Sequence, residues 1–286
     1  MGIVLSAIAI SISSCKKDKT ETSDISLHDI NLASNSTLGQ YLTNKKGLTL
    51  YMSANDADGI SSCTGACESL WQAFTADLTT AKLDEGLSAT DFATITTASG
   101  KKQVTYKGWP LYTYSPPADN GYGNTINRAE DPGSTKGDGV GGLWFVAKPD
   151  YSIMLANKQL TGLDGNTYKS DYTIGAGNTV YFTDGNGRTL YNFSVDSFNI
   201  NKFTKADFSN NAIWPIYEKE QVVAPSILNK ALFGTITVAG RKQLTYRGWP
   251  LYNFGQDAER GSNKGVSVIA PGTWPVAVKD ITEARR

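Results

Sequence analysis

An internal duplication constrains the fold of this 286-residue chain more than any other feature of its sequence. Residues 101–112 read KKQVTYKGWPLY and residues 241–252 read RKQLTYRGWPLY, so nine of the twelve positions are identical. Residues 41–51 and 181–191 match at the same offset of 140 residues. Repeated segments of this kind fold into repeated structural units. We therefore expect two similar domains in tandem.

The duplication divides the chain into five expected parts. Residues 1–15 are predicted to be a lipoprotein signal peptide that ends at a cysteine, and residues 16–37 a polar tether. Repeat 1 is expected to cover residues 38–150 and repeat 2 residues 178–281. Residues 151–177 lack a duplicate, and we interpret them as a connector that packs partly on its neighbours.

Turn residues and alternating apolar positions predict antiparallel β-structure in both repeats. Hairpins are expected at the turns Asn44–Gly47 and Asp184–Gly187, where the second turn carries the strong hairpin signal Asp-Gly-Asn-Gly. A short helix is expected near residues 63–74 and again near residues 205–217. The predicted fold class is mainly β: two tandem homologous small antiparallel β domains, each with one short helix. Further strand pairs are expected at residues 92–97 with 103–106 and at 233–238 with 243–246.

All six tryptophans fall into pairs that the duplication relates. A large aromatic residue that persists through a duplication is more simply a packing residue than an exposed platform for a ligand. We therefore interpret the tryptophans as structural aromatics, and we expect Trp109 and Trp249 to point into the cores of their own repeats. The pairs are Trp71 with Trp214, Trp109 with Trp249, and Trp144 with Trp274.

The N-terminus resembles that of a bacterial lipoprotein. Residues 2–12 are apolar or small, a stretch as long as the hydrophobic region of a signal peptide and too short for a transmembrane helix. The run 12–15, Ile-Ser-Ser-Cys, resembles a lipobox, and charged residues follow it. A buried first helix is the alternative. Acylation of Cys15 would anchor the chain by its lipid in the cell envelope, on the outer membrane. Both the periplasmic face and the surface face of that membrane are compatible with the sequence.

Two further cysteines, Cys63 and Cys67, stand close together in the segment Cys-Thr-Gly-Ala-Cys. Such a pair in an oxidising compartment is expected to form a disulfide. The loop is short, so the expected stabilisation is roughly 2 kcal/mol. The spacing differs from the two-residue gap of thioredoxin-like redox motifs. We predict a structural bridge rather than a redox centre.

Charge and histidine content exclude several classes of function. Basic and acidic residues both number 27, which argues against a nucleic-acid partner held by bulk electrostatics. The only histidine is His28, in the polar N-terminal stretch. A Ser-His-Asp or Cys-His nucleophile, a histidine-rich metal site and a histidine-ligated haem all need an imidazole within the fold. No cofactor or metal is expected.

A recurring aromatic-acidic motif resembles the secreted-repeat lipoprotein family, which is marked by Tyr-x-(Phe/Trp/Tyr)-x-x-Asp. The resemblance covers about residues 38–150 and 178–280. The first repeat departs from the pattern, because Ser53 replaces an aromatic residue and Pro117 replaces an acid. The motif residues are Tyr51 and Asp56, Tyr112 and Tyr114, Tyr191, Phe193 and Asp196, and Tyr252, Phe254 and Asp257.

The motif has a structural and a functional interpretation. Tyr and the aromatic residue two positions later share one face of a strand, and the Asp can cap a turn. Alternatively, Asp196 and Asp257 could share a carboxylate site. The leading hypothesis is a non-catalytic binding or scaffolding module that is held at the membrane by its lipid and contacts an envelope protein or a small ligand. The alternative is an envelope redox or carboxylate-based enzyme component.

Overall fold

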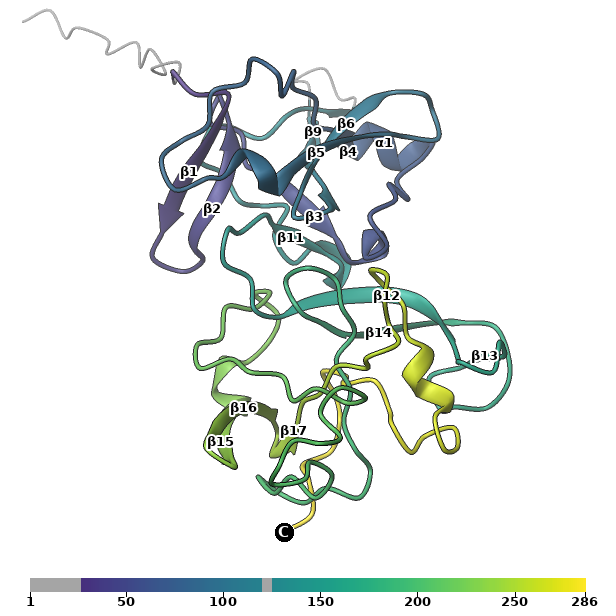
Figure 1. Cartoon of the computed structure of the whole chain (residues 1–286). Coiled ribbons are helices and arrows are strands. Elements are labelled where there is room, and N and C mark those ends of the chain that lie inside the picture. Colours follow the sequence, from purple (N-terminus) through teal and green to yellow (C-terminus); the bar gives the residue numbers. More distant parts are fainter. Residues whose placement is uncertain (1–26, 120–124) are drawn as a thin grey trace, which may run out of the picture.

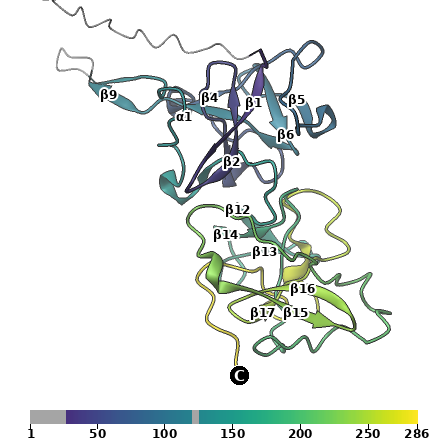
Figure 2. The ribbon, with the colours of Figure 1, turned by 90° about the vertical axis from the view of Figure 1, so that its left-hand side faces the viewer.

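The computed structural model describes residues 27–119 and 125–286. The predicted acylation site Cys15 lies outside these residues, as do residues 16–26, half of the expected tether. Residues 30–35, which the sequence analysis assigned to the tether, form a strand of repeat 1 instead. Figure 1 shows two β-rich lobes, one built by the first half of the chain and the other by the second half. Figure 2 shows the same two lobes after a 90° turn. The predicted fold class, mainly β with two tandem units, is confirmed.

Repeat 1 contains short strands that pair in antiparallel fashion. The helix predicted near residues 63–74 is present as α1 (Ala66–Leu70). The largest sheet has the strand order β11-β3-β8-β4. The strands are β1 (Ile30–Asn35), β2 (Gly39–Asn44), β3 (Tyr51–Ser53), β4 (Trp71–Ala73), β5 (Phe92–Thr96), β6 (Lys102–Tyr106), β7 (Trp109–Pro110), β8 (Tyr112–Tyr114), β9 (Pro117–Asp119), β10 (Thr125–Asn127) and β11 (Trp144–Val146).

Repeat 2 has the same plan with fewer regular strands, and its predicted helix near residues 205–217 is absent. Asparagine side chains bind the backbone there: Asn210 Oδ1 accepts from Lys205 N at 3.0 Å, and Asn211 Oδ1 accepts from Ile216 N at 3.0 Å. Such bonds compete with helix formation. The strands are β12 (Met154–Thr161), β13 (Thr167–Tyr168), β14 (Asn178–Thr183), β15 (Phe233–Val238), β16 (Arg241–Tyr246) and β17 (Trp249–Pro250).

The segment 151–177, which we interpreted as a connector without a counterpart, supplies a strand of repeat 2. Strand β12 pairs with β14 along six residue positions, as β1 pairs with β2 in repeat 1. The prediction that this segment has no counterpart in repeat 1 is wrong for residues 154–161. Strands β1 and β12 differ in sequence, but each pairs in the same way with the strand that follows the turn. The expectation that the segment packs on its neighbours is confirmed, since Leu155 and Leu160 are buried.

The predicted hairpins are present with the expected turns. Gly47 N donates to Asn44 O at 2.8 Å, and Gly187 N donates to Asp184 O at 3.0 Å. In the two-residue turn after β6, Lys107 and Gly108 both have positive φ angles, of 48° and 77°. The equivalent turn after β16 has the same conformation, which matches the twist of a hairpin.

Each repeat is itself made of two similar halves. We define half-repeat 1a as residues 30–74, 1b as 92–147, 2a as 153–217 and 2b as 233–277. Every half begins with a pair of long strands, continues through a turn into a Leu-Tyr segment, and ends three residues after a tryptophan. The chain therefore contains four copies of one small unit.

A closed ring of three backbone hydrogen bonds ties the halves together. Leu42 N donates to Ala147 O at 2.8 Å, Ala147 N to Leu50 O at 2.7 Å, and Leu50 N to Leu42 O at 2.9 Å. Ala147 lies three residues after Trp144, in the other half of the repeat. Each hairpin is thus hydrogen-bonded to the end of its partner half, and neither half can form the ring of three hydrogen bonds alone. The three equivalent rings are Val104–Phe74–Leu111, Phe182–Ala277–Leu190 and Leu244–Tyr217–Leu251.

The two repeats meet end to end, with the turn after β6 resting on the turn after β14. Trp109 Nε1 donates to Gly185 O at 2.9 Å. Arg260 Nη1 donates to Lys107 O at 2.7 Å and also to Asn186 O, and its guanidinium lies 4.8 Å from the Trp109 ring. Burial lowers the pKa of Arg260 to about 10. This residue therefore links turns from both repeats.

The prediction that Trp109 and Trp249 both point into the core of their own repeat is wrong in part. Trp109 is 1 % exposed, but it is buried between the repeats. Trp249 is only half-buried, and its Nε1 donates to Thr282 O in the C-terminal segment at 2.8 Å. Residues 282–286 cover part of this surface of repeat 2, where Ala284 N donates to Arg247 O at 3.0 Å.

Candidate functional site

The complete motifs of repeat 2 form two crossed tyrosine–carboxylate pairs. Tyr191 and Tyr252 are neighbours on adjacent segments, and each donates its backbone N–H to the other's carbonyl. The Tyr191 hydroxyl donates to Asp257 Oδ2 at 2.6 Å, and the Tyr252 hydroxyl donates to Asp196 Oδ2 at 2.7 Å. The tyrosine of each motif therefore binds the acid of the other motif.

Repeat 1 keeps the crossed pairs although its second motif lacks the acid. The Tyr112 hydroxyl donates to Asp56 Oδ2 at 2.6 Å. The Tyr51 hydroxyl donates to Glu130 Oε2 at 2.5 Å. Glu130 comes from a position thirteen residues after Pro117, which stands where the motif predicts an acid. A longer loop and a longer side chain thus restore the missing carboxylate.

A Gly-Ser-x-Lys-Gly segment in each repeat holds the second carboxylate. In repeat 2, Asp257 Oδ1 accepts from Ser262 Oγ at 3.0 Å and from Lys264 N at 2.9 Å. Gly265 N donates to the Tyr191 hydroxyl at 3.2 Å, and a Cβ at Gly265 would lie 2.8 Å from that tyrosine ring. Only glycine fits this close approach. The same bonds in repeat 1 involve Ser134, Lys136 and Gly137.

Stacked tryptophans fill the space between the crossed pairs. The Trp214 and Trp274 rings lie 3.7 Å apart at an angle of 8°, and Phe254 and Phe193 cover their outer faces at 4.5 and 4.4 Å. The aromatic residue of each motif therefore extends the stack. In repeat 1, Trp71 and Trp144 stack at 3.8 Å with Tyr114 on one side only, since Ser53 has no ring.

Burial controls the ionisation of these clusters. It raises the pKa of Asp196 and of Asp257 to about 6, although hydrogen bonds from the tyrosine hydroxyls and backbone N–H groups oppose the rise. Burial also raises the pKa of Tyr191 and Tyr252 far above the ordinary value. The tyrosines therefore remain neutral donors over the whole physiological pH range.

The motif residues build cores rather than a reaction site. The motif acids Asp56, Asp196 and Asp257, together with Glu130, are at most 7 % exposed. Each carboxylate accepts from the tyrosine of the other motif and from further donors, so the acids of different motifs do not converge on an open cleft. Among residues 27–119 and 125–286, no group of three or more His, Cys, Asp or Glu side chains is placed to hold a metal ion.

The predicted disulfide between Cys63 and Cys67 is present, with the two Cα atoms 5.3 Å apart. Cys63 packs in the aromatic cluster of repeat 1 that contains Trp71 and Trp144. Phe203, its counterpart in repeat 2, lies edge-on to the Trp274 ring at 4.8 Å. The disulfide and the phenylalanine therefore fill equivalent positions beside the stacked tryptophans.

Comparison with known families identifies the repeated unit. The model of a family described as a secreted repeat of unknown function matches residues 33–75, 93–122 and 235–278. These three segments of the chain are similar to this secreted repeat. The matches fall on half-repeats 1a, 1b and 2b, so the unit of the family is the half-repeat rather than the 140-residue duplication. No curated protein and no solved structure matches the chain.

The family match agrees with the predicted resemblance and indicates a protein that acts outside the cytoplasm. Within the described parts of the chain, no helix has the length and apolar character needed to cross a bilayer. Half-repeat 2a is not matched, although it contributes Tyr191, Phe193, Asp196 and Trp214 to the same arrangement. Half-repeat 2a therefore has the same arrangement as the three halves that the family model matches.

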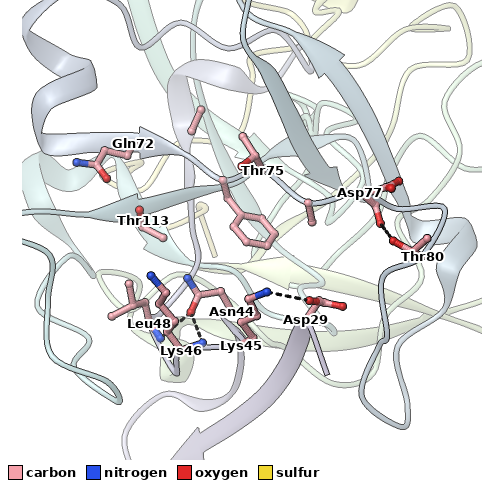
Figure 3. A pocket seen from close by; sticks show the side chains of 13 residues that line it. Asp29, Asn44, Lys45, Lys46, Leu48, Gln72, Thr75, Asp77, Thr80 and Thr113 are labelled. Carbon is pink, nitrogen blue, oxygen red and sulfur yellow. Dashed lines mark hydrogen bonds and ion pairs between the residues drawn. The ribbon is translucent and has the colours of Figure 1, made fainter. Parts of the chain in front are cut away.

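An open cavity of about 530 Å³ lies on repeat 1, away from the motif clusters. Figure 3 shows the turn residues Asn44, Lys45 and Lys46 on one side of the cavity, and Gln72 and Thr113 on the other. Further lining residues are Asp29, Leu48, Phe74, Thr75, Asp77 and Thr80. The sequence analysis placed Asn44, Lys45 and Lys46 in a hairpin turn but predicted no binding role for any of the lining residues, because they belong to ordinary turn and strand-end positions.

Both signs of charge reach this cavity. Lys45 Nζ lies 3.6 Å from Asp29 Oδ1, and both side chains are well exposed. Asp77 accepts from the Thr79 hydroxyl at 2.7 Å. Lys46 is exposed on the same turn as Lys45. The site can therefore bind a polar or charged partner, and it is far more accessible than the motif acids.

Proposed function

We propose that this protein is a non-catalytic binding module of the cell envelope, which is anchored by a lipid on Cys15 and binds a partner in the open cavity of repeat 1. The observation that carries the proposal is the contrast between the two kinds of site. The motif tyrosines and acids are buried and hydrogen-bonded to one another, whereas the cavity at residues 44–46 is open and lined by polar and charged side chains.

The location of the cavity supports binding at the far end of the molecule. Asn44 pairs with Ile30 at the start of β1. Figure 1 shows that β1 begins at the end of repeat 1 opposite to repeat 2. Asp29, near the start of the described residues, lines the cavity, so a tether that precedes it would hold the cavity close to the membrane surface or to proteins at that surface.

Lysine footprinting tests the proposal even while the partner is unidentified. A small acylating reagent is applied to intact envelopes and to the purified protein. We expect Lys45 and Lys46 to react more slowly in the envelope, because a bound partner covers them. Lys205 and Lys242, which are exposed on repeat 2, serve as controls and should react equally in both samples. Equal reactivity of Lys45 and Lys46 in the two samples would contradict binding at the cavity.

A further inference from the structure

A second cavity on repeat 1, with a volume of about 430 Å³, lies beside the first motif. It is lined by residues 59–61, in the loop after the motif, and by residues 95–98, at the turn of the hairpin formed by β5 and β6. Ile60, Ile95 and Ala98 form its apolar part. Among the described residues that line it, none is charged or aromatic. The cavity therefore suits a small neutral group.

A buried acceptor without a donor lies on the cavity side of this hairpin. Gln103 is fully buried, and its Nε2 donates to Leu111 O at 2.9 Å, which fixes the orientation of the amide. Its Oε1 has no hydrogen-bond partner in the part of the chain that the structure describes. Gln103 lies directly opposite Ile95, which lines the cavity, so the two side chains share one face of the sheet. A buried oxygen without a donor is unfavourable, so a donor on a ligand would be stabilised there.

Repeat 2 shows which chemical group satisfies this acceptor. The equivalent residue, Gln243, makes the same bond through its Nε2, to Leu251 O at 2.9 Å. Its Oε1 accepts a hydrogen bond from Asn201 Nδ2 at 2.7 Å. Asn201 is the counterpart of Ser61, since each lies five residues after the aspartate of the first motif in its repeat. A carboxamide thus fills, in repeat 2, a place for which the serine of repeat 1 is too short.

The Ser61 side chain does not take over the contacts of Asn201. Its hydroxyl is paired with the Tyr112 hydroxyl at 2.8 Å, and Ser61 lines the cavity. In repeat 2 the carboxamide oxygen of Asn201 also accepts from Phe203 N at 3.0 Å. The equivalent N–H in repeat 1, that of buried Cys63, donates to no residue within the described ranges. Repeat 1 therefore lacks a partner for both ends of the carboxamide that repeat 2 contains.

We propose that this cavity binds a carboxamide, the side chain of a glutamine or asparagine in a partner protein, whose NH2 group donates to Gln103 Oε1. A carboxylate or ammonium group would be buried there without a countercharge, which is costly. The aliphatic lining favours a side chain over a sugar ring. Because Oε1 is closed off from solvent, binding requires a lining side chain, such as that of Ser61, to turn aside. The site is independent of the cavity at residues 44–46, which is lined by other residues.

An NMR titration of the protein without its predicted signal peptide tests the proposal. The probe is propionamide, which has the structure of a glutamine side chain. We expect it to shift the backbone amide signals of residues 59–61 and 95–98 and to leave those of the equivalent residues 199–201 and 236–239 unchanged. N,N-Dimethylpropionamide lacks the N–H donor and propionate carries a charge, so each should bind about tenfold more weakly or less well still.

Exchanging the two counterpart residues provides matched variants. Ser61→Asn should weaken propionamide binding about tenfold or more, because its own carboxamide takes the place of the ligand. Asn201→Ser should create a second site, seen as shifts at residues 199–201 and 236–239, and a folded variant without such shifts would contradict the inference. Ala98→Trp, at an exposed position, blocks the cavity without changing the core and should also abolish binding.

Three results would overturn the inference. The first is the absence of any shift at residues 59–61 and 95–98. The second is equal binding of the three compounds, and the third is unchanged binding by both Ser61→Asn and Ala98→Trp. Tighter binding of N-acetylglucosamine than of propionamide would overturn the assignment of the ligand to a protein side chain. Lysine footprinting at residues 45 and 46 is unaffected by these outcomes, so the two proposals fail separately.

Discussion

Replacing Tyr252 by phenylalanine should reveal how the crossed pairs stabilise the fold. The substitution removes one hydroxyl that is 2.7 Å from Asp196 Oδ2 and leaves the buried ring in place. Asp196 then keeps a single strong donor, Lys202 N at 2.7 Å. Hydrogen bonds to charged groups contribute about 1.5–3 kcal/mol, and neutral ones about 1 kcal/mol. The loss should therefore depend on the ionisation of Asp196.

The sign of the pH dependence follows from the raised pKa of Asp196. Its folded-state value of about 6 exceeds the value of about 3.9 for an exposed aspartate, so its ionisation costs stability as the pH rises from about 4 through 6. The Tyr252 hydroxyl reduces that cost by binding the carboxylate. The variant should thus lose about 1 kcal/mol at pH 5 and about 2–3 kcal/mol at pH 8.

Urea unfolding of both proteins at the two pH values measures this difference. Tyr246→Phe is the matched control, because the Tyr246 hydroxyl donates at 2.8 Å to a neutral carbonyl, Lys279 O. It should cost about 1 kcal/mol at either pH. A loss in Tyr252→Phe that is the same at pH 5 and pH 8, or no larger than in the control, would refute the role assigned to the crossed pair.

Three further predictions concern the anchor, the disulfide and the junction of the repeats. Labelling with a palmitate analogue should mark the wild type but not Cys15→Ala, and equal labelling would exclude acylation at this residue. Replacing both Cys63 and Cys67 by alanine should cost about 2 kcal/mol in thermal or urea unfolding and leave the circular dichroism unchanged, whereas a loss of fold would show a larger role. Arg260→Ala should cost about 2 kcal/mol, because the carbonyls of Lys107 and Asn186 in the two repeats lose a charged donor. Arg241→Ala, at an exposed ion pair, should cost less than about 1 kcal/mol, and equal losses would contradict a stabilising link between the repeats at Arg260.

Local features of the fold could be predicted from the sequence. The hairpin turns follow from Asp-Gly-Asn-Gly and basic-Gly pairs, whose backbone preferences act within a few residues. The duplication of the tryptophans correctly indicated that most of them are core residues, and the short spacing of Cys63 and Cys67 indicated their bridge. These conclusions needed only neighbouring residues or a comparison of the chain with itself.

Contacts between distant segments could not be predicted in this way. The motif indicated that Tyr and Asp belong together, but not that each tyrosine binds the acid of the other motif. Glu130 carries no motif signal, because it follows a loop that is absent from repeat 2. Strand β12 lacks sequence similarity to β1 because two-stranded pairing depends on backbone geometry, which many sequences satisfy. The backbone hydrogen bonds that join the two halves of each repeat likewise depend on tertiary packing.

The burial of the motif acids is the central claim, and carboxyl carbon NMR measures it most directly. In protein labelled at aspartate, the signals of Asp196 and Asp257 should titrate with midpoints near 6, since burial raises the pKa of each. Exposed Asp171, whose pKa is lowered by the hydrogen bond from the Thr173 side chain, provides the internal comparison in the same sample. Midpoints near 4 for both motif acids would show that they face solvent, and would contradict a closed core built by the secreted-repeat motif.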